Sequence, residues 1–301
     1  MSSPLPRPLA GLPVRRLTRD DLVPCADLSE DRGWPRDEHR WGLLLAAGTC
    51  FGIDDPDGKG LMATCVVTSY GPRMAAIGML LVAGRHARQG IARQLMHQVI
   101  ESTGGTPLSL YATAQGRPLY EKLGFVAVGR AERMSGHFQP SAGPGSPDAD
   151  VDPGLGVSPG LTVRPASAGD LQAMLRLDGH AFGLDRTHLL TRLPAFADHL
   201  RVAEEGGELV GFAGLWPSSA SHVVGPLIAR DTATAKLLVS SLAGATDRPL
   251  RADIDARHEE LLRWLGERGL GHGSATTVMT LGEQPPGDWT QCFAPLSVAT
   301  G

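Results

Sequence analysis

The chain has 301 residues, of which 42% are hydrophobic, and a formal net charge of −4 at pH 7. That length predicts two domains, and the mild charge without a basic stripe argues against nucleic acid as a partner. The first residues do not form a signal peptide and no apolar run of about 18 residues suggests a membrane span, so we expect a cytoplasmic protein.

The first half alternates short apolar strand patterns with amphipathic helix patterns. Gly48 ends one expected helix, and the run Asp54-Asp55-Pro56-Asp57-Gly58 favours a tight turn, so its flanking strands should form a hairpin. In chain order the patterns predict strand 14–17, helices 20–28 and 37–47, strands 49–53, 61–69 and 75–82, helix 90–102, strand 108–112, helix 117–123, and strands 125–128 and 132–138.

A linker divides the chain at 140–160, where proline and glycine interrupt helix and strand alike. It separates an expected N-terminal domain, 1–139, from a C-terminal domain, 161–301. The second domain repeats much of the order of the first, with strand 161–164, helix 169–180, a helical stretch at 187–193, strands 201–204, 209–216 and 223–228, helix 232–242, strand 250–254, helix 259–268 and strand 275–281. This order predicts an α/β (α+β) fold in which each domain is a mixed, mostly antiparallel twisted sheet flanked by helices.

The two halves begin alike, which suggests duplication. Val14-Arg15-Arg16-Leu17-Thr18-Arg19-Asp20-Asp21-Leu22 matches Val163-Arg164-Pro165-Ala166-Ser167-Ala168-Gly169-Asp170-Leu171. Each run reads as a short strand followed by a Thr or Ser helix cap with an aspartate three residues later. A weaker echo links Leu123-Gly124-Phe125 to Arg268-Gly269-Leu270 at nearly equal offsets.

The segment Met79 to Met96 carries the clearest chemical pattern. An apolar strand ends, a tight basic loop follows, and a helix starts at Gly90. Unpaired amides at a helix start and the positive end of its dipole bind phosphate, and small residues at 90 and 92 let a phosphate approach the backbone. A glycine that merely permits a turn beside solvated arginines explains the same residues.

This segment resembles motif A of the GNAT superfamily of acetyl-CoA-dependent N-acetyltransferases, with Val82 and Gly90-Ile91-Ala92 in the matching places. The Gln or Arg that the family has three residues before the glycine is Ala87 here. A second segment, Tyr111 to Phe125, resembles motif B, which ends in Leu-Tyr-x-x-Leu-Gly-Phe. We therefore expect two tandem GNAT-like domains.

The resemblance implies a set of site residues in the first half. It implies that two parallel strands, ending near Val82 and Ala112, splay apart beyond a bulge and admit the pantetheine arm, and that Tyr120 protonates the departing thiolate; an amphipathic tyrosine packing its helix onto the sheet is the other interpretation. Acetyl-CoA is the implied co-substrate, with no metal, and its implied binding residues are Leu80, Leu81, Val82, Arg88, Gln89, Gly90, Ile91, Ala92, Arg93 and Thr113.

The acceptor side is less defined. Asp31-Arg32-Gly33-Trp34 resembles a Gly-Trp segment of one tandem subgroup, so Trp34 is a candidate for the acceptor pocket together with Glu38. A general base is needed to deprotonate the amine before it attacks directly. The candidates are Glu30, Asp37, Glu38 and His39, and exposed charges or packing explain these residues equally well.

The second half lacks the phosphate-binding pattern. His222 to Asp231 resembles the Gly-Pro-Leu-x-Ala segment of the C-terminal domain of YitH/HolE-type acetyltransferases, and Asp231 near the helix start would repel pyrophosphate. We expect this half to be degenerate and to shape the acceptor pocket or an interface. Asp253 and Asp255 follow a strand and either face a ligand or lie at a solvated strand end.

We expect an N-acetyltransferase, an acyltransferase that acts on a small-molecule amine, with a secondary-metabolite or antibiotic-like amine plausible. The alternatives are a peptide or protein amine as acceptor, or a non-catalytic acetyl-CoA-binding regulatory protein, which Ala87 makes conceivable. The four cysteines have no ligand spacing, so no metal is expected, and Cys25 is either structural or a reactive thiol. The protein is expected to be a monomer or a homodimer.

Overall fold

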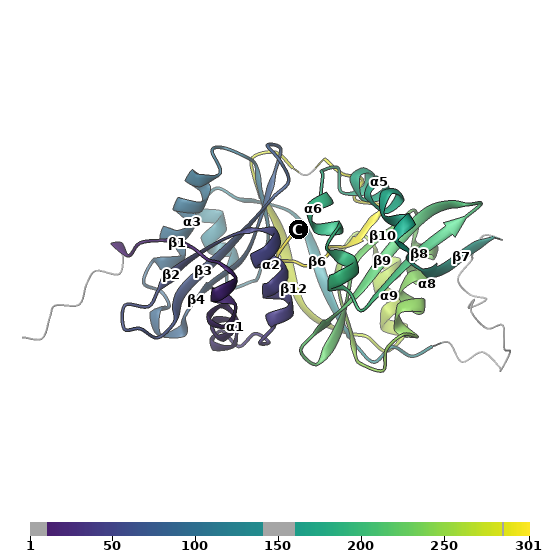
Figure 1. Ribbon diagram of the computed structural model, residues 1–301, viewed down its shortest axis with the longest axis horizontal. Coiled ribbons are helices and arrows are strands. Elements are labelled where there is room, and N and C mark those ends of the chain that lie inside the picture. The colour runs from purple at the N-terminus through teal and green to yellow at the C-terminus, as the bar shows by residue number, and fades with distance from the viewer. Residues whose placement is uncertain (1–10, 141–159, 285) are drawn as a thin grey trace, which may run out of the picture.

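The computed structural model describes residues 11–140, 160–284 and 286–301. Helices cover both faces of one long twisted sheet (Figure 1). The first half contains, in chain order, β1 (Arg15–Arg16), the 3₁₀ turn η2 (Arg19–Asp21), α1 (Leu22–Asp31), α2 (Glu38–Ala47), β2 (Thr49–Asp54), β3 (Leu61–Ser69), β4 (Ala75–Val82), η3 (Gly84–His86), α3 (Ile91–Ser102), β5 (Leu108–Ala112), α4 (Arg117–Lys122) and β6 (Val126–Gly136).

The second half follows the same plan. It contains β7 (Leu161–Pro165), η5 (Ala168–Asp170), α5 (Leu171–Ala181), α6 (Thr187–Leu190), α7 (Leu193–Phe196), β8 (His199–Glu205), β9 (Glu208–Ser218), β10 (Ser221–Ala229), α8 (Thr232–Ala243), β11 (Leu250–Asp255), α9 (Glu259–Glu267), β12 (Gly271–Leu281) and β13 (Cys292–Ala294). The mixed, mostly antiparallel architecture flanked by helices is confirmed.

The two halves share strands at the centre of the sheet. The strand order is β1-β2-β3-β4-β5-β12-β6-β11-β10-β9-β8-β7, with β13 paired to β10. β12, from the second half, therefore lies between β5 and β6 of the first half, and β6 pairs with β12 on one side and β11 on the other. Figure 1 shows β6 and β12 crossing the middle of the molecule. The sheet consequently runs without interruption through both halves.

The duplicated start of each half is confirmed in detail. Thr18 and Asp21 form a capping box, and Ser167 and Asp170 form its counterpart. Arg15 pairs with Asp21 at 2.7 Å, and Arg164 pairs with Asp170 at 2.8 Å. Each arginine thus ties the entering strand to the helix cap that follows it, by the same contact in both halves.

Each half also has one parallel strand pair, β4–β5 in the first and β10–β11 in the second. One face of the sheet carries α1 and α2, which share apolar clusters with the tail after β13 and with α5, α6 and α7. We call this the α1–α2 face. The opposite face carries α3 and α4, and in the second half α8 and α9.

The main differences between the observed and the expected elements lie at three places. The two strands expected at 125–128 and 132–138 are the single strand β6, because β12 and β11 pair with it along both edges and register shifts absorb the irregularity. The helical stretch expected at 187–193 is two short helices, with Pro194 in the first turn of α7. β13 was not expected.

None of the helices in these three ranges combines the length and apolar character needed to cross a bilayer. The expected linker at 140–160 falls, apart from its two end residues, outside the described residues.

Candidate functional site

The first half has a gap in the strand pairing between its two parallel strands. β4 and β5 pair through Ala75–Leu108, Ala76–Ser109 and Ile77–Leu110, and the pairing ends there although β4 continues to Val82. Met79 has a left-handed φ of 49°, and the register between β3 and β4 shifts at this point, which marks a bulge. The strands therefore diverge, and the edge of β4 that carries Leu80 to Val82 faces the gap.

The helix after β4 begins without a side-chain cap. Gly90 is the N-cap of α3, has a φ of 82° and makes no side-chain cap hydrogen bond. The first helical hydrogen bond runs from the Gln94 amide to the Gly90 carbonyl at 3.0 Å, so the amides of residues 91–93 precede it and point out of the helix end. A Cβ built on Gly90 would meet no atom within 4 Å. This helix start therefore has the space and the donors for a phosphate group.

Asp55 holds the loop between β4 and α3 in place. Its buried carboxylate accepts hydrogen bonds from Arg85 Nε at 2.7 Å and from the His86 ring at 2.8 Å. Burial alone would raise the pKa of Asp55, but the hydrogen bonds from His86, from the Asp57 amide and from Arg85 lower it to about 2. This role of Asp55 was not expected, because nothing in the hairpin sequence shows that one of its aspartates faces a loop 30 residues later.

The other predicted coenzyme residues surround the same corner. Arg88, Gln89 and Arg93 are exposed on the loop and first turn of α3, while Ile91 is buried beneath it. Thr113 follows β5, and its hydroxyl accepts a hydrogen bond from the Gly116 amide at 3.2 Å. The structure thus brings the residues at the end of β4, the start of α3 and the end of β5 to one end of the sheet.

Tyr120 lies on α4 with 9% of its surface exposed. Its ring contacts Phe125 edge-on, with ring centroids 5.8 Å apart, and belongs to the apolar cluster under α3. Burial, with a smaller contribution from Cys65, raises the pKa of the phenol. Tyr120 therefore stays protonated at neutral pH, and its aromatic body also packs the helix onto the sheet.

The predicted acceptor residues lie at the α1–α2 connection. Trp34 is 36% exposed, and Glu38 pairs with Arg36 Nη2 at 3.0 Å. The end of α1 reaches the coenzyme corner, since Asp31 accepts a hydrogen bond from the Gly84 amide at 2.6 Å.

Two of the four candidate bases contact the second half, Asp37 as a buried group and His39 as an exposed one. Asp37 is 2% exposed and accepts a hydrogen bond from Ser218 at 2.7 Å. His39 stacks on Phe196 with ring centroids 4.4 Å apart, and its Nε2 lies 2.7 Å from the Phe196 carbonyl. Glu30 and Glu38 remain exposed.

The corresponding gap in the second half is filled. Pairing of β10 with β11 ends at Val224, and beyond it β13 pairs with β10 through Ala294 and Cys292. The start of α8 is also closed, because Asp231 accepts a hydrogen bond from the Thr234 amide at 2.8 Å. Both features that are open in the first half are thus occupied in the second by the chain's own groups.

Asp253 and Asp255 are on β11 and buried, so the interpretation as a solvated strand end is wrong. Asp253 accepts a hydrogen bond from Arg133 at 2.8 Å, and Asp255 accepts one from Arg257 Nη2 at the same distance. Cys25 is fully buried, and burial raises its pKa to about 12, which favours the structural interpretation. Within residues 11–140, 160–284 and 286–301, no group of three or more His, Cys, Asp or Glu side chains is placed to hold a metal ion.

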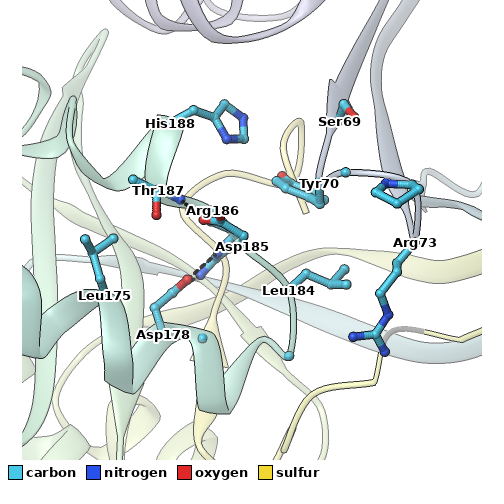
Figure 2. A pocket seen from close by; sticks show the side chains of 14 residues that line it. Ser69, Tyr70, Arg73, Leu175, Asp178, Leu184, Asp185, Arg186, Thr187 and His188 are labelled. Carbon is cyan, nitrogen blue, oxygen red and sulfur yellow. Dashed lines mark hydrogen bonds and ion pairs between the residues drawn. The ribbon is translucent and has the colours of Figure 1, made fainter.

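A cavity of about 690 Å³ lies between the halves (Figure 2). One wall is the β3–β4 turn with Tyr70 and Arg73, and the other is the segment from α5 to α6, where Asp178 and Arg186 form a buried ion pair. The Tyr70 and His188 rings lie 5.9 Å apart across it. This cavity adjoins the start of β4, whereas the coenzyme corner lies at its end.

Comparisons with known proteins agree with this geometry. Two family models, each described as an acetyltransferase (GNAT) domain, match residues 66–138 and 174–294. The uncharacterized N-acetyltransferase YitH of Bacillus subtilis is 29% identical over 273 residues, which is 89% of this chain and 91% of YitH.

Solved structures share the whole fold. A Pyrococcus horikoshii protein has a TM-score of 0.78 at 19% identity, covering 97% of this chain and 96% of its own. A tandem GNAT protein from the clavulanic acid biosynthesis pathway has a TM-score of 0.62 at 13% identity, covering 91% of this chain and 100% of its own.

The two family matches together span more than half of the chain, one in each half, and each half has the single parallel strand pair described above. The chain therefore belongs to the GNAT superfamily and is a tandem-domain acetyltransferase.

Proposed function

We propose that this enzyme transfers an acetyl group from acetyl-CoA to an amine of a small molecule, by direct attack of the amine. One observation carries the proposal: the uncapped start of α3 at Gly90 and the unpaired edge of β4 lie at the same end of the sheet. A diphosphate and an extended amide-containing arm need these two features side by side.

The coenzyme would be held by backbone more than by side chains. The amides of residues 91–93, assisted by Arg88, Gln89 and Arg93, suit a pyrophosphate, and the open edge at Leu80 to Val82 suits the pantetheine amides. The space over Gly90 supports this fit, because it leaves room for phosphate oxygens against the helix end.

The chemistry then needs three groups. A backbone amide at the β4 bulge would polarise the thioester carbonyl, the acceptor nitrogen would attack the carbonyl carbon, and the carbon–sulfur bond would break. Tyr120 would give its proton to the departing sulfur, and its raised pKa keeps the phenol protonated at neutral pH until the sulfur departs. A base takes the proton from the amine; Glu38 and Glu30 suit this role better than Asp37 or His39, which already bind the second half.

The enclosure of β4 favours a small acceptor over a peptide. A Cβ at Gly78, beside the bulge, would lie 2.2 Å from the Ala299 carbonyl oxygen, so the tail after β13 packs directly against the strand. Tyr70 also donates a hydrogen bond to the Thr300 carbonyl. The α1–α2 face of β4 is therefore covered, which leaves little room for an extended chain.

We assign the second half a supporting role, with domain boundaries near residues 139 and 161. β13 and Asp231 occupy the places that a coenzyme would need there. The α1–α2 connection with Trp34, together with the covering segments of the second half, would form the acceptor pocket.

Calorimetry with coenzyme A, followed by thiol release from acetyl-CoA with a panel of amines, tests the proposal. We expect coenzyme A to bind with a dissociation constant in the micromolar to millimolar range, and we expect thiol release that depends on the amine. Uptake without turnover across the panel would favour a regulatory protein, which the exposed Ala87 in place of a Gln or Arg makes conceivable. Absence of uptake would reject the coenzyme site itself.

A further inference from the structure

Three arginines and two aspartates, from α2 and its N-cap, β6 and β11, interact electrostatically on the α1–α2 face. Arg133 and Asp253 are paired neighbours across β6 and β11, joined at 2.8 Å, and Arg251 precedes Asp253 by two residues, on the same side of β11. Arg40 lies on α2 and Asp37 is the N-cap residue of that helix. Arg40 interacts electrostatically with Asp37, Arg133 and Asp253. Arg251 interacts with all four other groups.

The cluster contains more donors than acceptors. Nε and Nη2 of Arg40 and Nε of Arg251 are buried without a hydrogen-bond partner among the described residues, and Arg40 as a whole is only 6% exposed. Both oxygens of Asp37 are already engaged, by the Arg40 amide at 3.0 Å and by Ser218 at 2.7 Å, and its nearest approach to Arg40 Nε is 3.7 Å. Three arginines against two aspartates leave one formal positive charge.

The pKa shifts of the arginines agree with this surplus of positive charge. Burial lowers the pKa of Arg40, and Arg133 lowers it further, against the opposing effects of Asp37 and Asp253. Burial also lowers the pKa of Arg251 to about 10, with Arg133 and Arg40 adding to the effect against Asp253. Buried guanidinium groups that repel one another and lack hydrogen-bond acceptors are costly. One added anion would supply acceptors and would also balance the surplus positive charge.

The cluster lies at the reactive end of the sheet. Thr277 of β12 pairs with Ala112, the last residue of β5, on one side and with Arg130 on the other. Arg133 is therefore three residues, or about 10 Å along the strand, beyond the level at which β5 ends. Tyr111, next to Ala112, interacts electrostatically with Asp253 and Asp255, so the cluster and the diverging strands share one side of the sheet.

We propose that Arg40 and Arg251 bind a carboxylate of the acceptor, so that the substrate is a small molecule with an amine at one end and a carboxylate at the other. A carboxylate fits better than a phosphate because it is a monoanion, which matches the single surplus charge. A guanidinium can bind it through two parallel hydrogen bonds. Arg133 and Arg251 are only partly buried, which leaves the cluster open on one side. This inference rests on the proposed function for the identity of the substrate.

The anion site can be tested without knowing the acceptor. Thermal unfolding is followed in sodium formate and in sodium chloride of equal ionic strength, and in formamide, each with and without coenzyme A to occupy the phosphate corner. Formate should raise Tm by about 2 °C more than chloride at about 100 mM, whereas formamide should not. Arg251→Gln and Arg40→Gln should each abolish the difference in Tm between formate and chloride, whereas Arg251→Lys should keep part of it.

Arg263→Gln, an exposed arginine on α9 on the opposite face, is the matched control and should respond as the wild type does. If Arg40→Gln does not fold, Arg251→Gln alone decides, since its side chain is less buried. Equal Tm in formate and chloride, or an unchanged response in both glutamine variants, would overturn the anion site and show that the cluster only joins the two halves.

A separate measurement tests whether the acceptor carries a carboxylate. Thiol release is compared for amino acids and for the carboxamides of the same amino acids, including compounds with longer spacing between amine and carboxylate. We expect kcat/KM at least tenfold higher for the acids, and a ratio near one in Arg251→Gln. Preference for the amides in the wild type would reject the acid-bearing acceptor. Failure to take up coenzyme A would reject the proposed function instead, while the formate comparison would still decide the anion site.

Discussion

The Asp55 carboxylate lies 2.8 Å from Nε2 of His86, although 31 residues separate them in the chain. The same carboxylate accepts a hydrogen bond from Arg85 and from the Asp57 amide, so the β2–β3 turn is joined to the loop that leads into α3. The conformation of the proposed phosphate site therefore depends on a residue outside its own motif.

Replacing Asp55 should weaken coenzyme binding, although Asp55 is not one of the residues proposed to contact the coenzyme. In Asp55→Asn the Arg85 and His86 contacts lose their charged acceptor, which should lower the free energy of unfolding by about 1–3 kcal/mol. Coenzyme A affinity should fall several-fold because the loop loses its support. Asp57→Asn, an exposed aspartate in the same turn, is the control. Unchanged affinity in Asp55→Asn would show that the loop does not need this contact.

The same contact predicts an acid-sensitive contribution to stability. The folded-state pKa of Asp55 is depressed from its ordinary 3.8 to about 2, so the ionised carboxylate is stabilised by folding. Its contribution is fully present above about pH 4 to 5 and is lost as the pH falls through about 2. The difference in unfolding free energy between wild type and Asp55→Asn should therefore be constant near neutrality and shrink below pH 4. A difference that grew on acidification would contradict the assigned direction.

Gly90 allows a second test of the phosphate corner. Its φ of 82° makes any side chain strained, so Gly90→Ala should cost about 1–2 kcal/mol of stability. The added methyl group would also stand where phosphate oxygens approach, and we expect coenzyme A affinity to fall at least tenfold. Gly105→Ala is a matched control, because Gly105 has a φ of 87° and equally open surroundings but lies beyond the other end of α3. It should lose similar stability and keep its affinity.

Tyr120 is predicted to matter for turnover more than for binding. Tyr120→Phe keeps the ring that packs against Phe125 and removes only the proton donor. The value of kcat should fall by about 10²-fold or more while the affinity for coenzyme A measured by calorimetry stays within about twofold. Tyr70→Phe, which removes the hydroxyl that donates to Thr300, is the control for loss of a buried phenol. Equal kcat in wild type and Tyr120→Phe would leave this tyrosine a packing residue.

Local patterns predicted the elements that form the coenzyme corner. β3, β4 and β5 have the expected bounds, because each is an apolar run between turn residues and the pattern lies within one segment. Gly90 was predicted as the helix start for the same reason. Asp55 and Arg251 were not predicted as site residues, because their importance comes from partners more than 25 residues away or on another element.

The exchange of strands between the two halves, which places β12 between β5 and β6, was also not predicted. The patterns at 125–128 and 132–138 predict strand, but nothing local to them indicates that the partners are β11 and β12, more than 100 residues later. The expected break near residue 130 disappears because both edges of β6 are paired. Register and partner choice are set by the tertiary structure, whereas strand character can be read from the sequence.

Because the two halves exchange strands, we predict that neither half folds alone. Without residues 160–301, β6 would lose both of its partners and β5 would expose the edge that β12 covers. Unpaired strand edges of this kind lead to aggregation. A fragment of residues 1–140 should therefore be insoluble or unfolded when expressed alone, and should become soluble and bind coenzyme A when co-expressed with residues 160–301.

In scanning calorimetry the intact chain should show one cooperative unfolding transition, because β6 and β12 cannot separate without opening both halves. A soluble, coenzyme-binding fragment on its own, or two well-separated transitions, would show that the halves are independent despite the shared sheet.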